Sequence, residues 1–185
     1  MSRINAINTD EANGKAKELL NTVQAKLGIT PNMTRTMAQS PSVLEAYLVF
    51  NGALGSTLNA KLREQIALLS AEENGCGYCL SAHTAIGKMA GLSDEDVLNA
   101  REGNSKDEKA DAALKFAGSV LEKRGKVSDE DLASIRRAGF SDGEMGEIVA
   151  HIALNTFTNF FNEVAKTDID FPLVEARSKN ASASR

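Results

Sequence analysis

Residues 62–83 read LREQIALLSAEENGCGYCLSAH, and this stretch indicates both the fold and the chemistry of the chain. Apolar residues recur in it at the spacing of one helix face: Leu62, Ile66 and Leu69. They predict a helix over residues 59–73, which the turn signal Asn74-Gly75 ends. A second helix is expected to begin at Cys76 and to end at Gly91. The stretch therefore predicts two helices joined by a tight turn.

The segment Cys76-Gly77-Tyr78-Cys79-Leu80-Ser81-Ala82-His83 holds both cysteines of the chain and one of its two histidines. On a helix, Cys76 and Cys79 are i,i+3 neighbours, and Cys79 and His83 are i,i+4 neighbours. All three side chains therefore share one face. Two thiols that can pair, beside an imidazole that can move a proton, favour a redox centre.

The composition fits one globular domain of 185 residues, with or without an additional arm. Hydrophobic residues make up 42% and charged residues 25%, as in a chain that buries a core. The net charge is −4 and the basic residues are dispersed, whereas a nucleic-acid-binding protein needs a basic stripe. The apolar runs are too short to span a bilayer, and the N-terminus lacks an apolar signal region. We therefore expect a cytoplasmic protein without nucleic-acid or membrane partners, in which thiols stay reduced unless they cycle.

The rest of the sequence has a helical pattern almost throughout. Helix start signals, each a serine before an acidic first turn, are found at Ser93, Ser128 and Ser141. The other expected helices cover residues 12–27, 32–39, 41–54, 107–123, 128–139 and 141–164, with a short one after Ser93. No run alternates at period two, so the prediction is an all-α fold. We divide the chain into a helical N-terminal arm at 1–39, which could pack on a neighbouring subunit, a domain at 40–172 and a flexible tail at 173–185.

The start of a helix stabilises a thiolate, because unpaired backbone N–H groups and the positive end of the helix dipole lie there. His83 can accept the thiol proton or stabilise the anion. If the turn folds the two helices back on one another, Glu64 can face His83 and raise its basicity. Which cysteine attacks stays open at this point. Adjacency to His83 favours Cys79, whereas a more N-terminal and more exposed position favours Cys76.

The cysteine pair is compatible with several other kinds of site, which differ in the context they need. A thioredoxin-like site needs CxxC within a βαβ pattern, and no strand is predicted before Cys76. Haem attachment needs a histidine directly after the second cysteine, where Leu80 stands. Zinc could be bound by Cys76, Cys79, His83 and Glu64, although a second CxxC or a histidine pair is missing. The cysteines could also be small buried side chains, or a dithiol that senses oxidation without turnover.

The pattern Glu64-x11-Cys76-x2-Cys79-x3-His83 resembles the active-site signature of the alkylhydroperoxidase D-like (AhpD-like) branch of the carboxymuconolactone decarboxylase superfamily. Flanking segments resemble the family as well, at residues 62–67, 74–79, 138–142 and 147–153. Residues 29–33 with Ser40-Pro41 resemble its longer, peroxidase-related members. The resemblance extends to about Pro172. It implies an AhpD-like helical domain, a thiol-dependent peroxidase that reduces alkyl hydroperoxides in antioxidant defence, and a homo-oligomer.

The resemblance also implies the roles of individual residues. Cys79 would be the peroxidatic thiol, and Cys76 would protonate the leaving group and then resolve the sulfenic acid as a disulfide. Glu64 and His83 would relay protons, and an external dithiol such as a lipoyl-bearing protein would reduce the disulfide. A histidine follows the first cysteine in well-studied AhpD proteins, and Gly77 in that place implies a shorter relay. True decarboxylases of the superfamily lack the CxxC pair, so this chain is not expected to be one.

No glycine-rich phosphate loop or dinucleotide fingerprint is present, so no bound cofactor is expected, and no metal is assigned. His151 lies among Ile148, Val149 and Ile152 in an apolar helical segment. This setting favours a buried core or interface histidine over a catalytic one.

Overall fold

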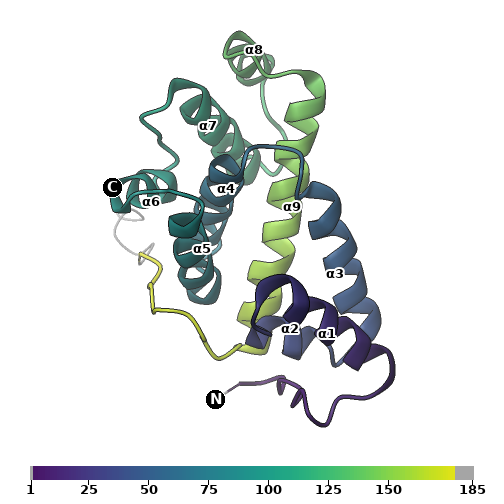
Figure 1. Cartoon of the computed structure of the whole chain (residues 1–185). Helices are drawn as coiled ribbons and strands as arrows, with labels where there is room; N and C mark the ends of the chain where they lie inside the picture. The colour runs from purple at the N-terminus through teal and green to yellow at the C-terminus, as the bar shows by residue number, and fades with distance from the viewer. Residues whose placement is uncertain (1, 178–185) are drawn as a thin grey trace.

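The computed structural model describes residues 2–177, which form nine helices and no strand (Figure 1). The prediction of an all-α fold is confirmed, and each expected helix is present with small shifts of its ends. The helices are α1 (Gly14–Leu27), α2 (Asn32–Met37), α3 (Pro41–Leu54), α4 (Ala60–Glu73), α5 (Gly77–Met89), α6 (Asp94–Arg101), α7 (Glu108–Glu122), α8 (Asp129–Arg137) and α9 (Asp142–Ala165).

Helix α4 forms the centre of the fold and packs against α5, α6, α7 and α9 (Figure 1). The predicted face of α4 is buried, but so is every residue from 65 to 72. The one-sided stripe expected from the sequence was too narrow, because neighbouring helices cover α4 on several sides. The side chain of Glu64, near the start of α4, is thereby placed largely inside the bundle.

A tight turn joins α4 to α5 and reverses the chain. Gly75 has a φ of +68°, a left-handed conformation that glycine adopts without steric cost. The Cys76 N–H donates to the Ala71 carbonyl at 2.9 Å, which closes the turn. A Cβ on Gly87 would lie 3.6 Å from the Glu64 Cβ, so the far end of α5 passes close to the beginning of α4. The two helices therefore run back along each other.

The serine caps predicted from the sequence are present. Ser93, Ser128 and Ser141 each accept a hydrogen bond from the N3 backbone N–H, while the N3 carboxylate accepts from the serine N–H. The last of these caps begins α9, which runs alongside both α4 and α3. Helix α9 thus runs from the end of the fold beside α8 to the end where the N-terminal helices α1 and α2 lie (Figure 1).

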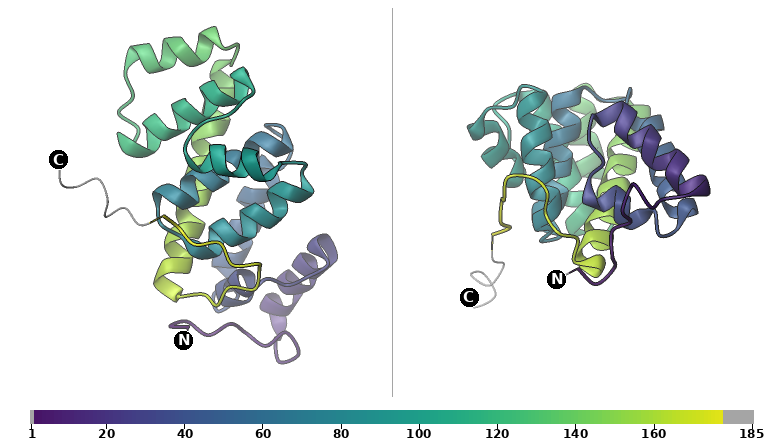
Figure 2. Two further views of the ribbon diagram at one scale, coloured as in Figure 1. Left: turned by 90° about the vertical axis from the view of Figure 1, so that its left-hand side faces the viewer. Right: turned by 60° about the horizontal axis from the view of Figure 1, so that its bottom comes forward.

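The N-terminal segment, expected as an arm, packs on its own chain. Residues of α1 and α2 form an apolar cluster with α3, made of Ala12, Ala16, Leu19, Leu20, Met37, Ala38 and Leu44. Phe161 of α9 packs against this cluster. Figure 2 shows α1 and α2 beside α3 and the C-terminal end of α9. The division of the chain at residue 40 stays a prediction.

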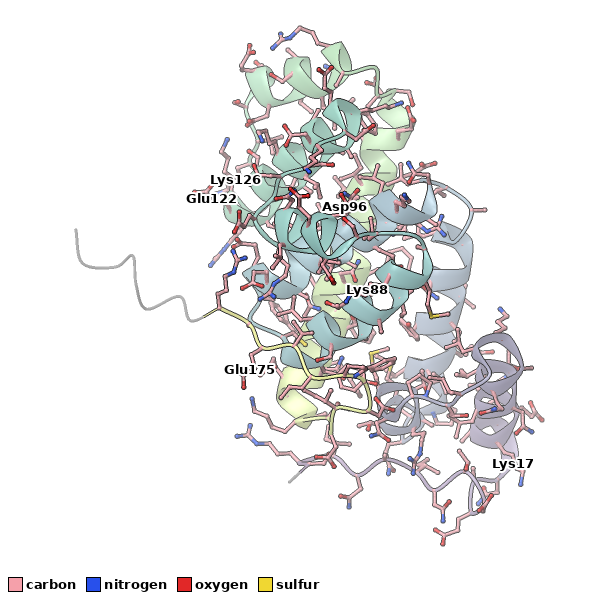
Figure 3. All side chains as sticks on the ribbon, turned by 60° about the vertical axis from the view of Figure 1, so that its left-hand side comes forward. Lys17, Lys88, Asp96, Glu122, Lys126 and Glu175 are labelled. Carbon is pink, nitrogen blue, oxygen red and sulfur yellow. The ribbon has the colours of Figure 1, made fainter. Side chains whose placement is uncertain are left out.

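After α9 the chain crosses the face of α5 in an extended segment, residues 167–177, which we call the C-terminal strap (Figure 2). The Val174 N–H donates to Ser81 Oγ at 2.9 Å, and the Arg177 N–H donates to Glu72 Oε1 at 2.7 Å. Figure 3 labels Glu175 on this strap. Residues 173–177, assigned to the tail, are therefore held against the domain. The remainder of that tail, 178–185, lies outside the described residues.

The surface of α9 leaves several large apolar side chains exposed: Val149, Phe157, Phe160 and Val164. Such a face is compatible with the predicted homo-oligomer, which stays a prediction. Within residues 2–177, none of the helices could serve as a membrane span.

Candidate active site

Glu64 and His83 meet across the interface between α4 and α5. His83 Nδ1 lies 2.8 Å from Glu64 Oε2, so the ring donates to the carboxylate and Nε2 is left for other partners. Burial lowers the pKa of His83, but the charge and hydrogen bond of Glu64 act in the opposite direction and the net pKa is raised. Glu64 therefore holds the ring in place and favours its protonated form.

The two cysteines lie at the start of α5, both as free thiols. Cys76 is the N-cap residue, and its Sγ accepts a hydrogen bond from the Cys79 N–H at 3.4 Å. The expectation that Cys76 is the more exposed thiol is wrong, because Cys76 is 0% exposed and Cys79 is 2% exposed. The turn from α4 tucks Cys76 into the core.

The environment shifts the pKa values of the two thiols in opposite directions. The hydrogen bond from Cys76 lowers the pKa of Cys79, and this outweighs the opposing effect of burial. His83 and the side-chain amides of Asn159 and Asn162 lower it further, so that the pKa of Cys79 is about 6. The same hydrogen bond, together with burial, raises the pKa of Cys76 well above its ordinary value. Cys79 is thus the more acidic thiol of the pair, and Cys76 is its hydrogen-bond donor.

A cavity of about 100 Å³ lies over Cys79 and His83. Its remaining lining is mainly apolar and aromatic, from Leu27, Pro31, Met33, Tyr47, Tyr78, Ala82, Ile86, Leu154 and Phe171, with Thr34, Asn51, Asn155 and Thr158. Two of these lining residues are partly open to solvent, because Leu27 is 60% exposed and Ile86 is 40% exposed. Cys76 does not line it. A small molecule in the cavity would therefore contact Cys79 and not Cys76.

Two asparagines of α9 complete the surroundings of Cys79, and the sequence analysis did not single them out. Asn162 Nδ2 donates to Cys79 Sγ at 3.3 Å, and Asn159 is fully buried beside it. A signal for them was present, because Asn155, Asn159 and Asn162 recur at helical spacing on the face that also carries His151. Buried amides on an otherwise apolar face indicate a polar partner.

Tyr47 of α3 is a further cavity residue that the sequence analysis missed. No hydrogen bond joins its hydroxyl to any of residues 2–177, and burial raises the pKa of the phenol to about 12. The hydroxyl therefore stays protonated at neutral pH and is available as a donor. Nothing local in the sequence marks Tyr47, because α3 reaches the site only through the tertiary fold.

Tyr78, between the cysteines, anchors the C-terminal strap. Its hydroxyl donates to Asp170 Oδ1 at 2.9 Å and accepts from the Met33 N–H at 3.2 Å. The strap also passes over Gly77, where an added Cβ would lie 3.8 Å from Ile169 Cδ1 and 3.9 Å from the Val174 carbonyl oxygen. An added Cβ at these distances would make ordinary van der Waals contact, so the strap covers position 77 without by itself requiring glycine there.

The second histidine of the chain lies outside this site. His151 is buried, its Nε2 lies 3.2 Å from Thr57 Oγ1, and burial lowers its pKa. It is a core histidine, as the apolar sequence around it indicated. A zinc site would need its four predicted ligands to converge, and residues 2–177 contain no group of three or more such side chains placed to hold a metal ion.

Residues 41–119 match the family model described as the carboxymuconolactone decarboxylase family. This part of the chain is therefore similar to the carboxymuconolactone decarboxylase family. The match begins with α3 and ends within α7, so it includes Glu64, both cysteines and His83. The N-terminal helices, α9 and the strap lie outside the matched residues.

Solved structures extend the likeness to the whole fold. An uncharacterized peroxidase-related protein from Ralstonia eutropha, with an alkylhydroperoxidase AhpD core, is 24% identical with a TM-score of 0.81 over 91% of this chain and 92% of its own. A peroxidase-related protein from Silicibacter is 22% identical with a TM-score of 0.76, covering 90% and 92%. A cysteine-to-alanine variant of the debrominase Bmp8 bound to 2,3,4-tribromopyrrole is 23% identical with a TM-score of 0.77, covering 92% of each chain. At these identities the likeness establishes the AhpD-like helical fold. No protein of curated function matches the chain.

Proposed function

We propose that this protein is a thiol-dependent peroxidase that reduces small alkyl hydroperoxides through a dithiol–disulfide cycle of Cys79 and Cys76. One observation carries the proposal. The acidic thiol of Cys79 lines a small apolar cavity that it shares with His83, and a second thiol lies directly behind it. A thiolate is the nucleophile in peroxide reduction, so an acidic thiol open to a substrate cavity supports this chemistry.

In the first step, Cys79 Sγ attacks the terminal oxygen of the hydroperoxide. An S–O bond forms, the O–O bond breaks, Cys79 is oxidised to a sulfenic acid, and the peroxide is reduced to an alcohol. His83 holds the proton taken from the Cys79 thiol and gives it to the leaving alkoxide. We assign this proton to His83 instead of Cys76, because His83 lines the cavity and Cys76 does not.

In the second step, the Cys76 thiol attacks the sulfur of Cys79. The S–S bond forms, the S–O bond breaks, and the hydroxyl leaves as water with the proton of Cys76. An external dithiol then reopens the disulfide by thiol–disulfide exchange and is itself oxidised. Both sulfurs are buried, so a small dithiol such as a lipoyl group is a better reductant than a thiol fixed on a protein surface. No bound cofactor takes part in this cycle.

The test is steady-state consumption of tert-butyl hydroperoxide with dithiothreitol as reductant. We expect multiple turnovers from the wild type and none above background from Cys79→Ser, with both proteins folded by circular dichroism. A protein that is oxidised once and stops would instead be a redox sensor. Full activity in Cys79→Ser would refute the assignment of the nucleophile.

A second candidate reaction is the reductive removal of bromide from a small aromatic compound. It is favoured by the aromatic lining of the cavity and by the tribromopyrrole held in the structurally similar Bmp8 variant. In this reaction a C–Br bond would become a C–H bond and bromide would leave. The dithiol of Cys79 and Cys76 would supply the two electrons and be oxidised to a disulfide. Release of bromide from 2,3,4-tribromopyrrole, measured beside the peroxide assay, distinguishes the two reactions.

A further inference from the structure

The side-chain amides of Asn159 and Asn162 surround the sulfur of Cys79 on the side formed by α9. Asn162 is 2% exposed and Asn159 is 0% exposed, so neither amide is solvated by bulk water. Burying a primary amide without a partner is costly, and buried polar groups in native proteins are nearly always hydrogen-bonded. Two such amides beside one thiol therefore require an account of what they bind.

The orientation of the Asn162 amide follows from its neighbours. Its Nδ2 lies 3.3 Å from Cys79 Sγ and 3.3 Å from Met33 Sδ. Both sulfurs are acceptors, and a thiolate would repel the Oδ1 atom in that place. The NH₂ group therefore points at the sulfurs, and Asn162 supplies a charge-assisted hydrogen bond to Cys79.

The orientation of the Asn159 amide is fixed by Asn74, the C-cap residue of α4. Asn74 Nδ2 donates to Asn159 Oδ1 at 2.9 Å, which commits that oxygen as an acceptor and turns the NH₂ group away from it. Asn74 directly precedes the turn that carries Cys76. The Asn159 NH₂ lowers the pKa of Cys79, yet within residues 2–177 its Nδ2 has no hydrogen-bond partner of normal geometry. The Asn159 NH₂ group is therefore held in a fixed orientation but has no hydrogen-bond acceptor among these residues in the reduced protein.

We infer that Asn162 and Asn159 form a two-amide cradle for Cys79, in which Asn162 holds the sulfur and the Asn159 Nδ2 receives the oxygen that the peroxide adds to it. The inference rests on the proposed function, because only an oxidising substrate delivers that oxygen. On oxidation the S–O bond places a new acceptor next to the thiol, and the unfilled N–H of Asn159 becomes paired. Asn159 does not line the cavity, so its N–H would reach the added oxygen alongside the sulfur, while His83 serves the leaving oxygen from the cavity side.

The sulfur-holding role can be tested without any peroxide. The rate at which iodoacetamide alkylates Cys79 is followed by peptide mass spectrometry as a function of pH, on the reduced full-length protein. Asn162→Leu has a similar volume without the donor, and we expect the midpoint of the alkylation profile to rise by about one pH unit, a roughly tenfold loss of thiolate at low pH. Asn104→Leu, the same change at an exposed site, should leave the midpoint unchanged.

The oxygen-receiving role is tested on a Cys76→Ser background, in which the sulfenic acid cannot be resolved. One equivalent of tert-butyl hydroperoxide is added, and the sulfenic acid is trapped with dimedone over time. We expect Asn159→Leu to slow its formation by about tenfold or more, beyond any change explained by its own alkylation midpoint. The smaller variants Asn159→Ser and Asn162→Ser replace the leucine variants where those fail to fold.

The outcomes separate this inference from the proposed function. Unchanged alkylation midpoints and unchanged rates of sulfenic acid formation in folded variants of both asparagines overturn the cradle, even if the wild type is an active peroxidase. A raised midpoint for Asn162→Leu in a protein that reduces no hydroperoxide supports the sulfur-holding part and overturns the proposed function. Slow sulfenic acid formation in Asn159→Leu, with wild-type kinetics in Asn104→Leu, supports the complete cradle.

Discussion

Glu64 Oε2 accepts a hydrogen bond from His83 Nδ1 at 2.8 Å, and this contact links the central helix α4 to the helix that carries the thiols. The contact occupies Nδ1, so Nε2 is left for a partner in the cavity that His83 lines. It also raises the pKa of His83, which favours the protonated ring that the proposed reaction uses to protonate the leaving alkoxide. The geometry therefore makes Glu64 a positioning residue that acts through His83.

Replacing this carboxylate should separate catalysis from folding. Glu64→Gln keeps the size of the side chain but removes the charge, so we expect sulfenic acid formation to slow by about 10²-fold, the typical contribution of a general acid or base. The measurement is stopped-flow reaction with tert-butyl hydroperoxide, with circular dichroism as a check of folding. Glu95→Gln, which removes an exposed partner of Lys106, is the matched control. Equal rates for Glu64→Gln and the control would remove Glu64 from the proton relay.

The two cysteine variants should fail in different ways. Cys76→Ser leaves the acidic Cys79 in place, so it should consume about one equivalent of peroxide and then stop as a sulfenic acid. Cys79→Ser removes the thiol that lines the cavity and should consume none. Mass spectrometry after dimedone treatment, at one equivalent of peroxide, distinguishes the two. A dimedone adduct on Cys76 in the Cys79→Ser protein would reverse the assignment of the attacking thiol.

The helices and the core of the site could be predicted from the sequence because they depend on local spacing. Cys76, Cys79 and His83 lie within three turns of one helix, and Asn74-Gly75 encodes the reversal that brings Glu64 to them. Serine caps and glycine breakers are likewise local, so the helix ends were close to those observed.

The cavity and its other walls could not be predicted in this way. Tyr78 and Asp170 are 92 residues apart in the sequence, and Asn162 is 83 residues from Cys79. Such contacts depend on where α9 and the strap pass, which no short pattern encodes. The relative burial of the cysteines was misjudged for the same reason, since order along the helix does not reveal that the turn tucks Cys76 into the core.

The anchor of the C-terminal strap should control access to the thiols. Tyr78→Phe keeps the ring but removes the hydroxyl that donates to Asp170 and accepts from the Met33 N–H. We expect a loss of about 1.5–3 kcal/mol in the free energy of unfolding by urea, as for a hydrogen bond to a charged group. Reaction of the thiols with the bulky reagent DTNB should become faster at the same time. Lower stability without faster thiol reaction would show that the strap does not limit access.

The phenol of Tyr47 should contribute to the reaction of organic peroxides. Tyr47 lines the cavity, and its hydroxyl, which has no hydrogen-bond partner among residues 2–177, stays protonated because the pKa is raised to about 12. We expect Tyr47→Phe to lower kcat/KM for tert-butyl hydroperoxide by about tenfold, the value of one hydrogen bond to a developing charge. The free energy of unfolding should change little, because no hydrogen bond is lost. Unchanged kcat/KM would assign Tyr47 to packing alone.

The two histidines should affect stability with opposite signs as the pH changes. The folded pKa of His151 is lowered by burial, so its contribution is fully present above the unfolded value of about 6.5 and is lost as the pH falls toward the folded value. The folded pKa of His83 is raised, so its contribution is fully present below about 6.5 and is lost as the pH rises through the folded value. Urea unfolding at pH 7.5 and pH 5.5 tests this. Relative to the wild type, His151→Gln should gain stability on acidification, and His83→Gln should lose it. The same pH dependence in both variants would contradict the assigned environments.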